Sequence, residues 1–272
     1  MILSSFSPQF PSYAARYLPS MTLRQIAALP DKAWAPVILA TGAIEQHGPH
    51  LPVAVDSLMG QVLLDLSLPL LSPEASCYVA PPITIGKSNE HTGFPGTLFI
   101  SKDTLRTHLL TVARQIHAWG FRHLAILNTH GGNTAVIAYT LREITAELGL
   151  QTGFLSSQAD YGLPAQEIAM GMHANTVETA WLQAVAPDYV RMEDAVCEYP
   201  ASINDPGKIR PERAPGTFAW ISSDLSRYGI MGDAPAGSQE KGKKWLQLAA
   251  HGYAKCIRDI GESARRALSN SS

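Results

Sequence analysis

The sequence predicts an α/β fold around a mostly parallel sheet, and the alternation of its segments is the main reason. Between Pro36 and Ser157, short apolar runs alternate with segments of helical periodicity. Connections of helical length join parallel strands through right-handed crossovers, which place helices on both faces of the sheet. The 272 residues contain no internal repeat and no clear linker, so we expect one domain over residues 1–272.

Four short apolar segments are the expected strands. Pro36–Ala40 (PVILA) is a continuous apolar run, which is typical of a buried strand. Tyr78–Gly86 contains two adjacent prolines, which favours a bent or edge strand. The remaining two expected strands are His123–Asn128 (HLAILN) and Gly153–Ser157.

The expected helices lie between and after these strands. Ser57–Leu68 and Asp103–Trp119 are the first two, and a third ends at Leu148, where Gly149 can close it. The last helix is expected to carry one apolar face, formed by Trp245, Leu248, Cys256, Ile257 and Ile260, and the final residues SNSS are expected to fray. Residues 200–242 are rich in Pro and Gly, and we expect an ordered loop region near the functional site because Trp220, Tyr228 and Met231 are costly to leave in solvent.

Composition excludes some partners. Charged residues make up 16% of the chain, below the roughly 25% of ordinary soluble domains. A large core would explain this deficit, and so would surface buried between subunits; of the two we favour the second and expect a homo-oligomer. The net charge is −2 and no run of Lys or Arg stands out, which argues against nucleic acid or an acidic membrane as partner.

Cysteine usage and the N-terminal residues bear on the compartment. The three cysteines are widely spaced and form no CxxC pair, so a disulfide framework is not expected. The first residues do not resemble a signal peptide, and no apolar run approaches the ~20 residues of a membrane helix. A cytoplasmic location is therefore predicted.

Three polar clusters each follow an expected strand or open an expected helix. The first contains Glu45, His47 and Asp56 in a loop interrupted by Gly and Pro. The second is NTHGGN, with His130 at the turn and Asn133 placed to cap the following helix. The third is HANTVETA, which begins at His173 and contains Glu178. The carboxyl ends of parallel strands meet at one edge of a sheet, so we expect the three clusters to converge.

Imidazole and carboxylate groups together suit Zn²⁺, Mn²⁺ or Fe²⁺. Three protein ligands and a water make a catalytic site, because the open position holds the nucleophile. A carboxylate such as Asp56 could bridge two metals, which share a water and lower its pKa toward neutrality.

Each of these residues also has an ordinary structural role available. Glu178 stands in capping-box spacing with Asn175, and His50, Glu90 and His91 could be hydrogen-bonded loop residues. The remaining histidines lie on helix or strand patterns and are expected to be structural; they are His108, His117, His123 and His251. The coincidence of three clusters favours a metal site.

Five stretches resemble, in order, the motifs of the creatininase (creatinine amidohydrolase) family. They are EQHGPHLPVAVD, EHTGFPGT, NTHGGN, HANTVET and, from Gly229 to Gly242, GIMGDAPAGSQEKG. The resemblance implies a three-layer α/β/α fold with a mostly parallel central sheet, a dinuclear metal centre and hydrolysis of C–N bonds in small amides. It also implies a hexamer or a similar ring.

The resemblance also implies roles for residues. Its metal ligands match Glu45, His47, Asp56 and His130, with Asp56 bridging, and a later carboxylate ligand matches Glu178. His173 matches a proton shuttle, and with Glu178 it forms the predicted catalytic pair. The predicted cofactors are two divalent ions, with zinc first and manganese or iron as alternatives. The predicted substrate-binding residues are His50, Glu90, His91, Asn133 and Trp220.

Three positions differ from creatininase or from many of its relatives; Thr176 bears on the metal preference, and the missing tryptophans bear on the substrate. Gly132 stands where creatininase has a glutamate ligand, and Thr176 stands where many relatives have glutamate. No Trp occurs between Trp119 and Trp181, where creatininase places the tryptophans that close over its ligand. Creatinine itself is therefore not the expected substrate.

The predicted function is metal-dependent hydrolysis of a small cyclic or linear amide, such as a lactam, a formamide or a ureide. An ester, lactone or peptide hydrolase on the same scaffold is an alternative. A non-catalytic metal or small-molecule binder is another, because of Gly132 and Thr176.

Overall fold

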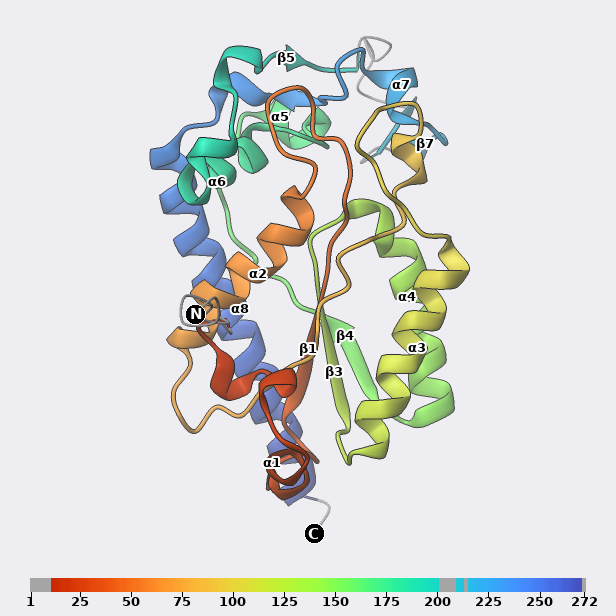
Figure 1. Cartoon of the computed structure of the whole chain (residues 1–272), viewed down its shortest axis with the longest axis vertical. Coiled ribbons are helices and arrows are strands. Elements are labelled where there is room, and N and C mark those ends of the chain that lie inside the picture. The colour runs from red at the N-terminus through yellow and green to blue at the C-terminus, as the bar shows by residue number, and fades with distance from the viewer. Residues whose placement is uncertain (1–10, 201–208, 213–214, 271–272) are drawn as a thin grey trace, which may run out of the picture.

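A four-stranded parallel sheet forms the centre of the molecule (Figure 1). The structure, a computed structural model, describes residues 11–200, 209–212 and 215–270. The strand order is β2-β1-β3-β4, with bounds β1 Pro36–Thr41, β2 Tyr78–Val79, β3 His123–Asn128 and β4 Gln151–Phe154. All four predicted strands are present, but β2 is only two residues long and lies at an edge, and β4 begins two residues before the predicted Gly153 and ends at Phe154. Thr41 pairs with Asn128 in register, so β1 and β3 end at the same level.

Two helices cover each face of this sheet, which confirms the three-layer α/β/α prediction (Figure 1). Helices α2 (Val55–Ser67) and α8 (Gln239–Ser269) lie on one face, and α3 (Lys102–Ala118) and α4 (Thr134–Leu148) lie on the other. Side chains of β1 alternate between the two resulting cores. Ile38 packs with α2 and α8, whereas Leu39 packs with α3 and α4, and both are fully buried.

Shorter elements surround the carboxyl ends of the strands, at the upper end of Figure 1. They are α5 Ala165–Met170, α6 Thr176–Val185, β5 Cys197–Glu198, β6 Ile209–Arg210, β7 Gly216–Thr217, α7 Ser222–Leu225 and β8 Gly232–Asp233. Helix α6 packs against α8, and β5 pairs antiparallel with β8. The remaining helix, α1 (Leu23–Ala28), lies at the opposite end.

Two predicted helix ends are confirmed and one is wrong. Gly149 closes α4 in the left-handed conformation, with φ 68°. At the start of α6, Oδ1 of Asn175 accepts from the Glu178 N–H and the Glu178 carboxylate accepts from the Asn175 N–H, which completes the capping box. The Asn133 side chain does not cap α4. It donates to the Gly42 carbonyl and accepts from the Lys87 N–H, so it ties three loops together.

The apolar face predicted for the last helix is correct except at Leu248. Trp245 and Ile257 are buried, but Leu248 is 42% exposed because it lies on the opposite side of α8. The helix ends at Ser269, the first residue of the SNSS that is expected to fray, and residues 271–272 lie outside the described part of the chain. No helix among the described residues is both long enough and apolar enough to cross a membrane.

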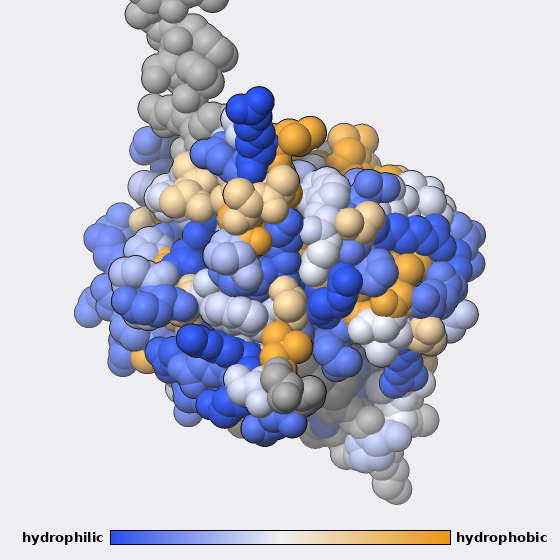
Figure 2. Space-filling view, turned by 90° about the horizontal axis from the view of Figure 1, so that it is seen from below, coloured by the Kyte–Doolittle hydropathy of each residue, from blue (hydrophilic) through white to orange (hydrophobic). Residues whose placement is uncertain are grey.

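The end of the molecule remote from the short elements has an ordinary mixed surface. Seen from below, hydrophilic residues predominate and hydrophobic ones form small separate patches (Figure 2). Scattered apolar residues of this kind are normal on a protein surface. The polar clusters lie at the other end, where β1 and β3 terminate.

Candidate metal centre

The five predicted metal ligands converge beyond the carboxyl ends of β1 and β3. Glu45 and His47 lie in the loop after β1, and Asp56 is in the first turn of α2. His130 follows β3 by two residues, and Glu178 is in the first turn of α6. Four of the five residues are buried and Glu178 is partly buried. Loops and helix starts far apart in sequence thus deliver their polar groups to one place.

These side chains form two groups of three that share Asp56. In the first, Nδ1 of His130 lies 3.2 Å from Oε2 of Glu45 and 3.3 Å from Oδ2 of Asp56. In the second, Nε2 of His47 lies 3.5 Å from Oδ1 of Asp56 and 4.0 Å from Oε1 of Glu178. Within each group the ligand atoms all lie within 4.8 Å of one another. Asp56 directs one oxygen to each group, so its carboxylate is placed to bridge two ions.

Several buried ligand atoms have no hydrogen-bond partner among the described residues. They are Oε2 of Glu45, Nε2 of His47 and Oδ2 of Asp56. Leaving such atoms unpaired costs about 1–3 kcal/mol each, and more when the group is charged. A cation in each group would satisfy them, and mixed nitrogen and oxygen ligands suit zinc or manganese. The residues present therefore fit the predicted metals.

Backbone carbonyls orient the two ligand histidines. Nδ1 of His47 lies 3.0 Å from the Glu45 carbonyl oxygen. Nε2 of His130 lies 3.1 Å from the Lys87 carbonyl oxygen and 3.1 Å from Oγ of Ser88. A carbonyl only accepts, so each of these nitrogens carries the proton. The other nitrogen of each ring faces the cluster, where its lone pair would be available to a bound metal.

The electrostatics of the cluster favour positive charge. Burial lowers the pKa of His47, but the Asp56 carboxylate outweighs it, with help from Glu178 and Glu45, and the pKa rises to about 10. Burial also lowers the pKa of His130, but the neighbouring carboxylates of Asp56, Glu45 and Glu90 outweigh it and hold the pKa well above its usual value. Burial raises the pKa of Glu178 to about 7. A site that draws protons onto buried imidazoles is also one that attracts cations.

His173 adjoins the cluster with its orientation fixed. Its Nε2 lies 2.6 Å from the Gln46 carbonyl oxygen, so the proton sits on this nitrogen, and Nδ1 faces Oε1 of Glu45 at 3.6 Å. Burial, followed by the neighbouring His47 and His91, holds the pKa of His173 well below its usual value. Nδ1 therefore carries no proton and faces the Glu45 carboxylate. It also lies within ligand distance of Glu45 and His47, so the geometry permits ligation as well.

Gln46 is a supporting residue that the sequence reasoning missed. Its Nε2 donates to Nδ1 of His91 at 2.8 Å and to the Gly229 carbonyl at 3.1 Å, and its Oε1 accepts from the Gly48 N–H. Nε2 of His91 then lies 3.4 Å from Oε1 of Glu45. Gly229 has φ +74°, and a Cβ there would lie 2.1 Å from Oε1 of Gln46. The C-terminal motif thus supports Glu45 through Gln46 and His91. The position of Gln46 inside the EQHG motif is the sequence feature that could have indicated this role.

A cavity of about 500 Å³ opens over this cluster. Of the predicted substrate-binding residues, Glu90, His91 and Trp220 line it, while His50 and Asn133 do not. His50 is buried and its Nε2 contacts Oγ1 of Thr179 at 2.8 Å, which is a structural position. The lining also includes residues that the sequence reasoning did not select, among them Lys87, Met172, Pro211, Glu212, Phe218 and Ala219.

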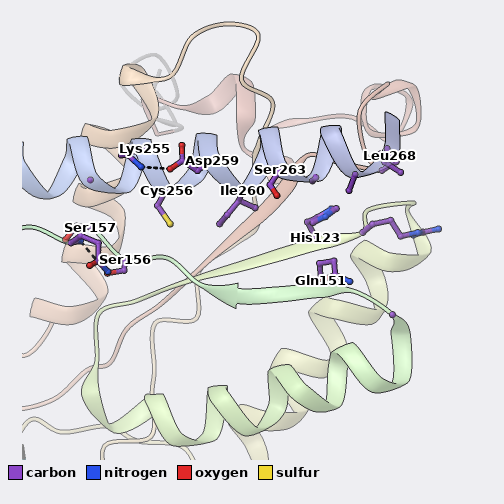
Figure 3. A pocket seen from close by; sticks show the side chains of 17 residues that line it. His123, Gln151, Ser156, Ser157, Lys255, Cys256, Asp259, Ile260, Ser263 and Leu268 are labelled. Atoms are coloured by element: carbon purple, nitrogen blue, oxygen red, sulfur yellow. Dashed lines mark hydrogen bonds and ion pairs between the residues drawn. The ribbon is translucent and has the colours of Figure 1, made fainter. Parts of the chain in front are cut away.

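A larger cavity, of about 1250 Å³, lies elsewhere, between β4, the segment after it and α8 (Figure 3). His123, Gln151, Cys256 and Ile260 are among its lining residues. None of the predicted metal ligands borders it. Its lining is mainly apolar and it presents no cluster of ligand groups, so we place the candidate site at the smaller cavity.

Thr176 faces away from the cluster. Its hydroxyl donates to the Asp233 carbonyl at 2.8 Å, and its N–H donates to the buried carboxylate of Glu167 at 2.9 Å. The replacement of a glutamate by Thr176 therefore leaves the two groups of ligands intact.

The three-layer fold, with buried carboxylates and imidazoles at the carboxyl ends of its strands, defines a class of candidate metal-dependent hydrolases. The sequence profile of the family described as "Creatininase: Creatinine amidohydrolase" matches residues 19–257. The chain belongs to the creatininase family.

Curated relatives of the chain have different described activities. A "Mycofactocin precursor peptide peptidase" of Mycolicibacterium smegmatis is 29% identical over 246 residues, covering 89% of this chain and 90% of the relative. A "3-dehydro-scyllo-inosose hydrolase" of Thermotoga maritima is 27% identical, covering 90% and 84%. A "Creatinine amidohydrolase" of Pseudomonas putida is 26% identical, covering 82% and 88%.

Solved structures share the fold. A structure described as "Creatininase Mn" superposes with a TM-score of 0.72 at 23% identity, covering 90% of this chain and 98% of that one. A mutant creatininase of "Zn-Zn type" has a TM-score of 0.72 at 24% identity, covering 89% and 97%.

Proposed function

We propose that this protein hydrolyses an amide C–N bond at a centre of two divalent cations, and that zinc is the first choice of metal. Glu45, Asp56 and His130 would hold one cation, and His47, Asp56 and Glu178 the other. The observation that carries the proposal is the set of buried ligand atoms without partners, arranged in two groups around one shared carboxylate. Manganese is an alternative, since one structural neighbour is described with it.

Two such cations, when bound, lower the pKa of a water and polarise a carbonyl oxygen. The protein supplies the arrangement around them. Asp56 fixes the separation of the two groups, and carbonyl contacts hold His47 and His130 in the tautomers that ligation needs. The cavity wall at Phe218 and Trp220 limits the water around a bound substrate.

His173 is the proposed proton donor to the leaving nitrogen. Nε2–H stays bonded to the Gln46 carbonyl, so only Nδ1 can take a proton from the attacking water and pass it on. Breaking a C–N bond requires this transfer because an amide anion is a poor leaving group. Oε1 of Glu45 lies 3.6 Å from Nδ1, and the His91 ring packs against the His173 ring with centroids 4.2 Å apart, so both help to hold the ring in place.

The test is a His173→Gln variant, which keeps hydrogen-bonding capacity but cannot shuttle a proton. We expect metal content to be retained while kcat falls by about 10²–10⁴-fold. Elemental analysis and steady-state kinetics on the same preparations measure both quantities. Loss of a metal equivalent in this variant would make His173 a ligand and remove it from the proton path.

The substrate class within this proposal is a small cyclic or linear amide: a lactam, a formamide or a ureide. The cavity volume of about 500 Å³ falls in the range of small-molecule sites, roughly 300–1,000 Å³. A panel of these compounds, followed by chromatography, tests the choice. Two bound cations without turnover of any amide or peptide would instead indicate a binding protein.

A second candidate is cleavage of a peptide bond near the end of a short peptide. It is favoured by the relative described as a precursor peptide peptidase, which matches 89% of this chain. Short peptides with free and blocked termini belong in the same panel. Turnover of peptides but not of lactams, formamides or ureides would replace the first candidate with this one.

A further inference from the structure

The segment from Lys87 to Glu90 wraps around the turn that follows His130. The Lys87 carbonyl oxygen lies 3.1 Å from Nε2 of His130, and the Lys87 ammonium lies 3.0 Å from Oε2 of Glu90. The other oxygen of Glu90, Oε1, lies 3.5 Å from the same Nε2. The Glu90 carboxylate is therefore held between a cation and the outer edge of the His130 ring. The inner edge of that ring, at Nδ1, faces Glu45 and Asp56.

Gly132 makes room for this arrangement. A Cβ at position 132 would lie 1.8 Å from Oε1 of Glu90, 2.5 Å from Nε2 of His130 and 2.6 Å from the Lys87 carbonyl oxygen. No side chain can occupy that place while Glu90 remains where it is. The adjacent Gly131 is different, because a Cβ there would meet no described atom within 4 Å. The requirement for glycine in this turn is thus specific to one position.

We propose that Glu90 is a positioning residue of the metal centre, which together with the Lys87 carbonyl holds the Nε2 edge of His130, and that Gly132 provides the space for it. The inference rests on the proposed function, because it needs a cation at Nδ1 of His130. A carboxylate at the outer nitrogen fixes the ring orientation and increases the electron density at the ligating nitrogen. Lys87 keeps the second oxygen of Glu90 occupied, so the carboxylate stays outside the ligand cluster.

Glu90 also lines the cavity, where the sequence analysis predicted a substrate-binding role. The two roles differ in what they change. A positioning residue alters the affinity of the protein for metal in the absence of any substrate. A residue that only touches substrate alters KM and leaves metal affinity as it was.

The experiment titrates chelator-treated protein with Co²⁺ and follows its absorption, using Glu90→Gln and Gly132→Ala beside the wild type. Each variant should bind one of two Co²⁺ ions about 10–100-fold more weakly, which is the usual cost of losing such a partner. Gly131→Ala is the matched control, the same substitution one residue away, and should bind Co²⁺ as the wild type does.

If Glu90→Gln binds Co²⁺ with the affinity of the wild type, the inference is overturned. If that variant also has a raised KM, Glu90 is a substrate-binding residue instead. Glu90→Gln preserves shape, so it decides the matter if Gly132→Ala fails to fold. Weakened binding in Gly131→Ala as well would overturn the role of Gly132, because the turn itself would then be the cause. A wild-type protein that binds no Co²⁺ would contradict the proposed metal centre itself. That result is distinct from the others, and the inference about Glu90 would be lost with it.

Discussion

Glu178 is placed to serve both roles that the sequence presented as alternatives. Its Oε2 accepts from the Asn175 N–H at the start of α6, while its Oε1 points toward His47 at 4.0 Å. One oxygen serves the helix and the other is available to a cation. The capping spacing was readable from the sequence because it is local. The approach to His47 was not, since it depends on how α6 packs beside the loop after β1.

Substitution at these two positions separates the roles. Glu178→Gln should lose about one metal equivalent and most activity, because an amide is a far weaker ligand than a carboxylate. Asn175→Ala should keep the metal and lower the free energy of unfolding by about 1 kcal/mol. Elemental analysis and urea unfolding measure the two effects. If Glu178→Gln retains its full metal content, Glu178 is not a metal ligand and only caps α6.

His50 makes a separate prediction about acid stability. Burial, followed by the charge of His47, lowers the pKa of His50 to about 4 from 6.5. The unfolded chain therefore binds a proton there before the folded one does. Above pH 6.5 His50 is neutral in the folded and the unfolded chain, and the free energy of unfolding has its full value. As the pH falls from 6.5 toward 4, this free energy decreases by about 2–3 kcal/mol, because the unfolded chain takes up the proton first.

Urea unfolding of metal-free protein between pH 4 and 7 measures this dependence. His50→Gln should flatten the curve over that interval, because the substituted side chain takes up no proton. His251→Gln, at an exposed position on α8, is the control and should leave the slope as in the wild type. An unchanged slope in His50→Gln would assign the acid sensitivity to other groups.

At the scale of elements, α8 owes its close packing to small residues. The helix lies against α2 and α6, and a Cβ at Gly252 would lie 1.8 Å from the Ser157 carbonyl oxygen. At Gly261 the nearest atoms would be 3.7 Å away, an ordinary contact. Periodicity predicted this helix and most of its buried face. It placed Leu248 wrongly because that side chain lies on the solvent side of a helix whose contacts come from several elements.

The same substitution at these two glycines should have opposite effects. Gly252→Ala would push α8 away from the backbone at Ser157 and should lower the free energy of unfolding by about 1–3 kcal/mol. Gly261→Ala removes conformational freedom from the unfolded chain at a compatible site and should stabilise by about 0.5–1 kcal/mol. Thermal and urea unfolding of both variants check the signs. A destabilised Gly261→Ala would show that α8 is as tightly packed there as at Gly252.

At the scale of the whole molecule, the sequence predicted the layers better than the surroundings of the site. Apolar runs and helical periods are local patterns, and the parallel sheet follows from them. Asn133 contacts Gly42 and Lys87, and Glu90 contacts His130, all of which are far away in the sequence. No local sequence pattern predicts such contacts. Part of the loop region expected near the site, residues 201–208 and 213–214, lies outside the described residues.

Removal of metal should affect the entire fold. The candidate ligands come from four separate segments, so bound cations would stabilise the native state, by about 2.7 kcal/mol per site at a hundredfold excess over Kd. Chelator-treated protein should melt at a lower temperature and lose activity, and Zn²⁺ or Mn²⁺ should restore both. Mg²⁺, which prefers oxygen ligands, is the control. A melting temperature insensitive to chelation would argue against a metal centre.

Several segments of the chain line the cavity over the cluster. Its base comes from the segments that carry the candidate ligands and from Lys87, Glu90 and His91, while residues 211–212 and 218–220 form a separate side of it. Exchange of residues on that side can alter which molecule fits without disturbing the atoms beneath. Selectivity in this protein can therefore evolve, or be redesigned, independently of reactivity.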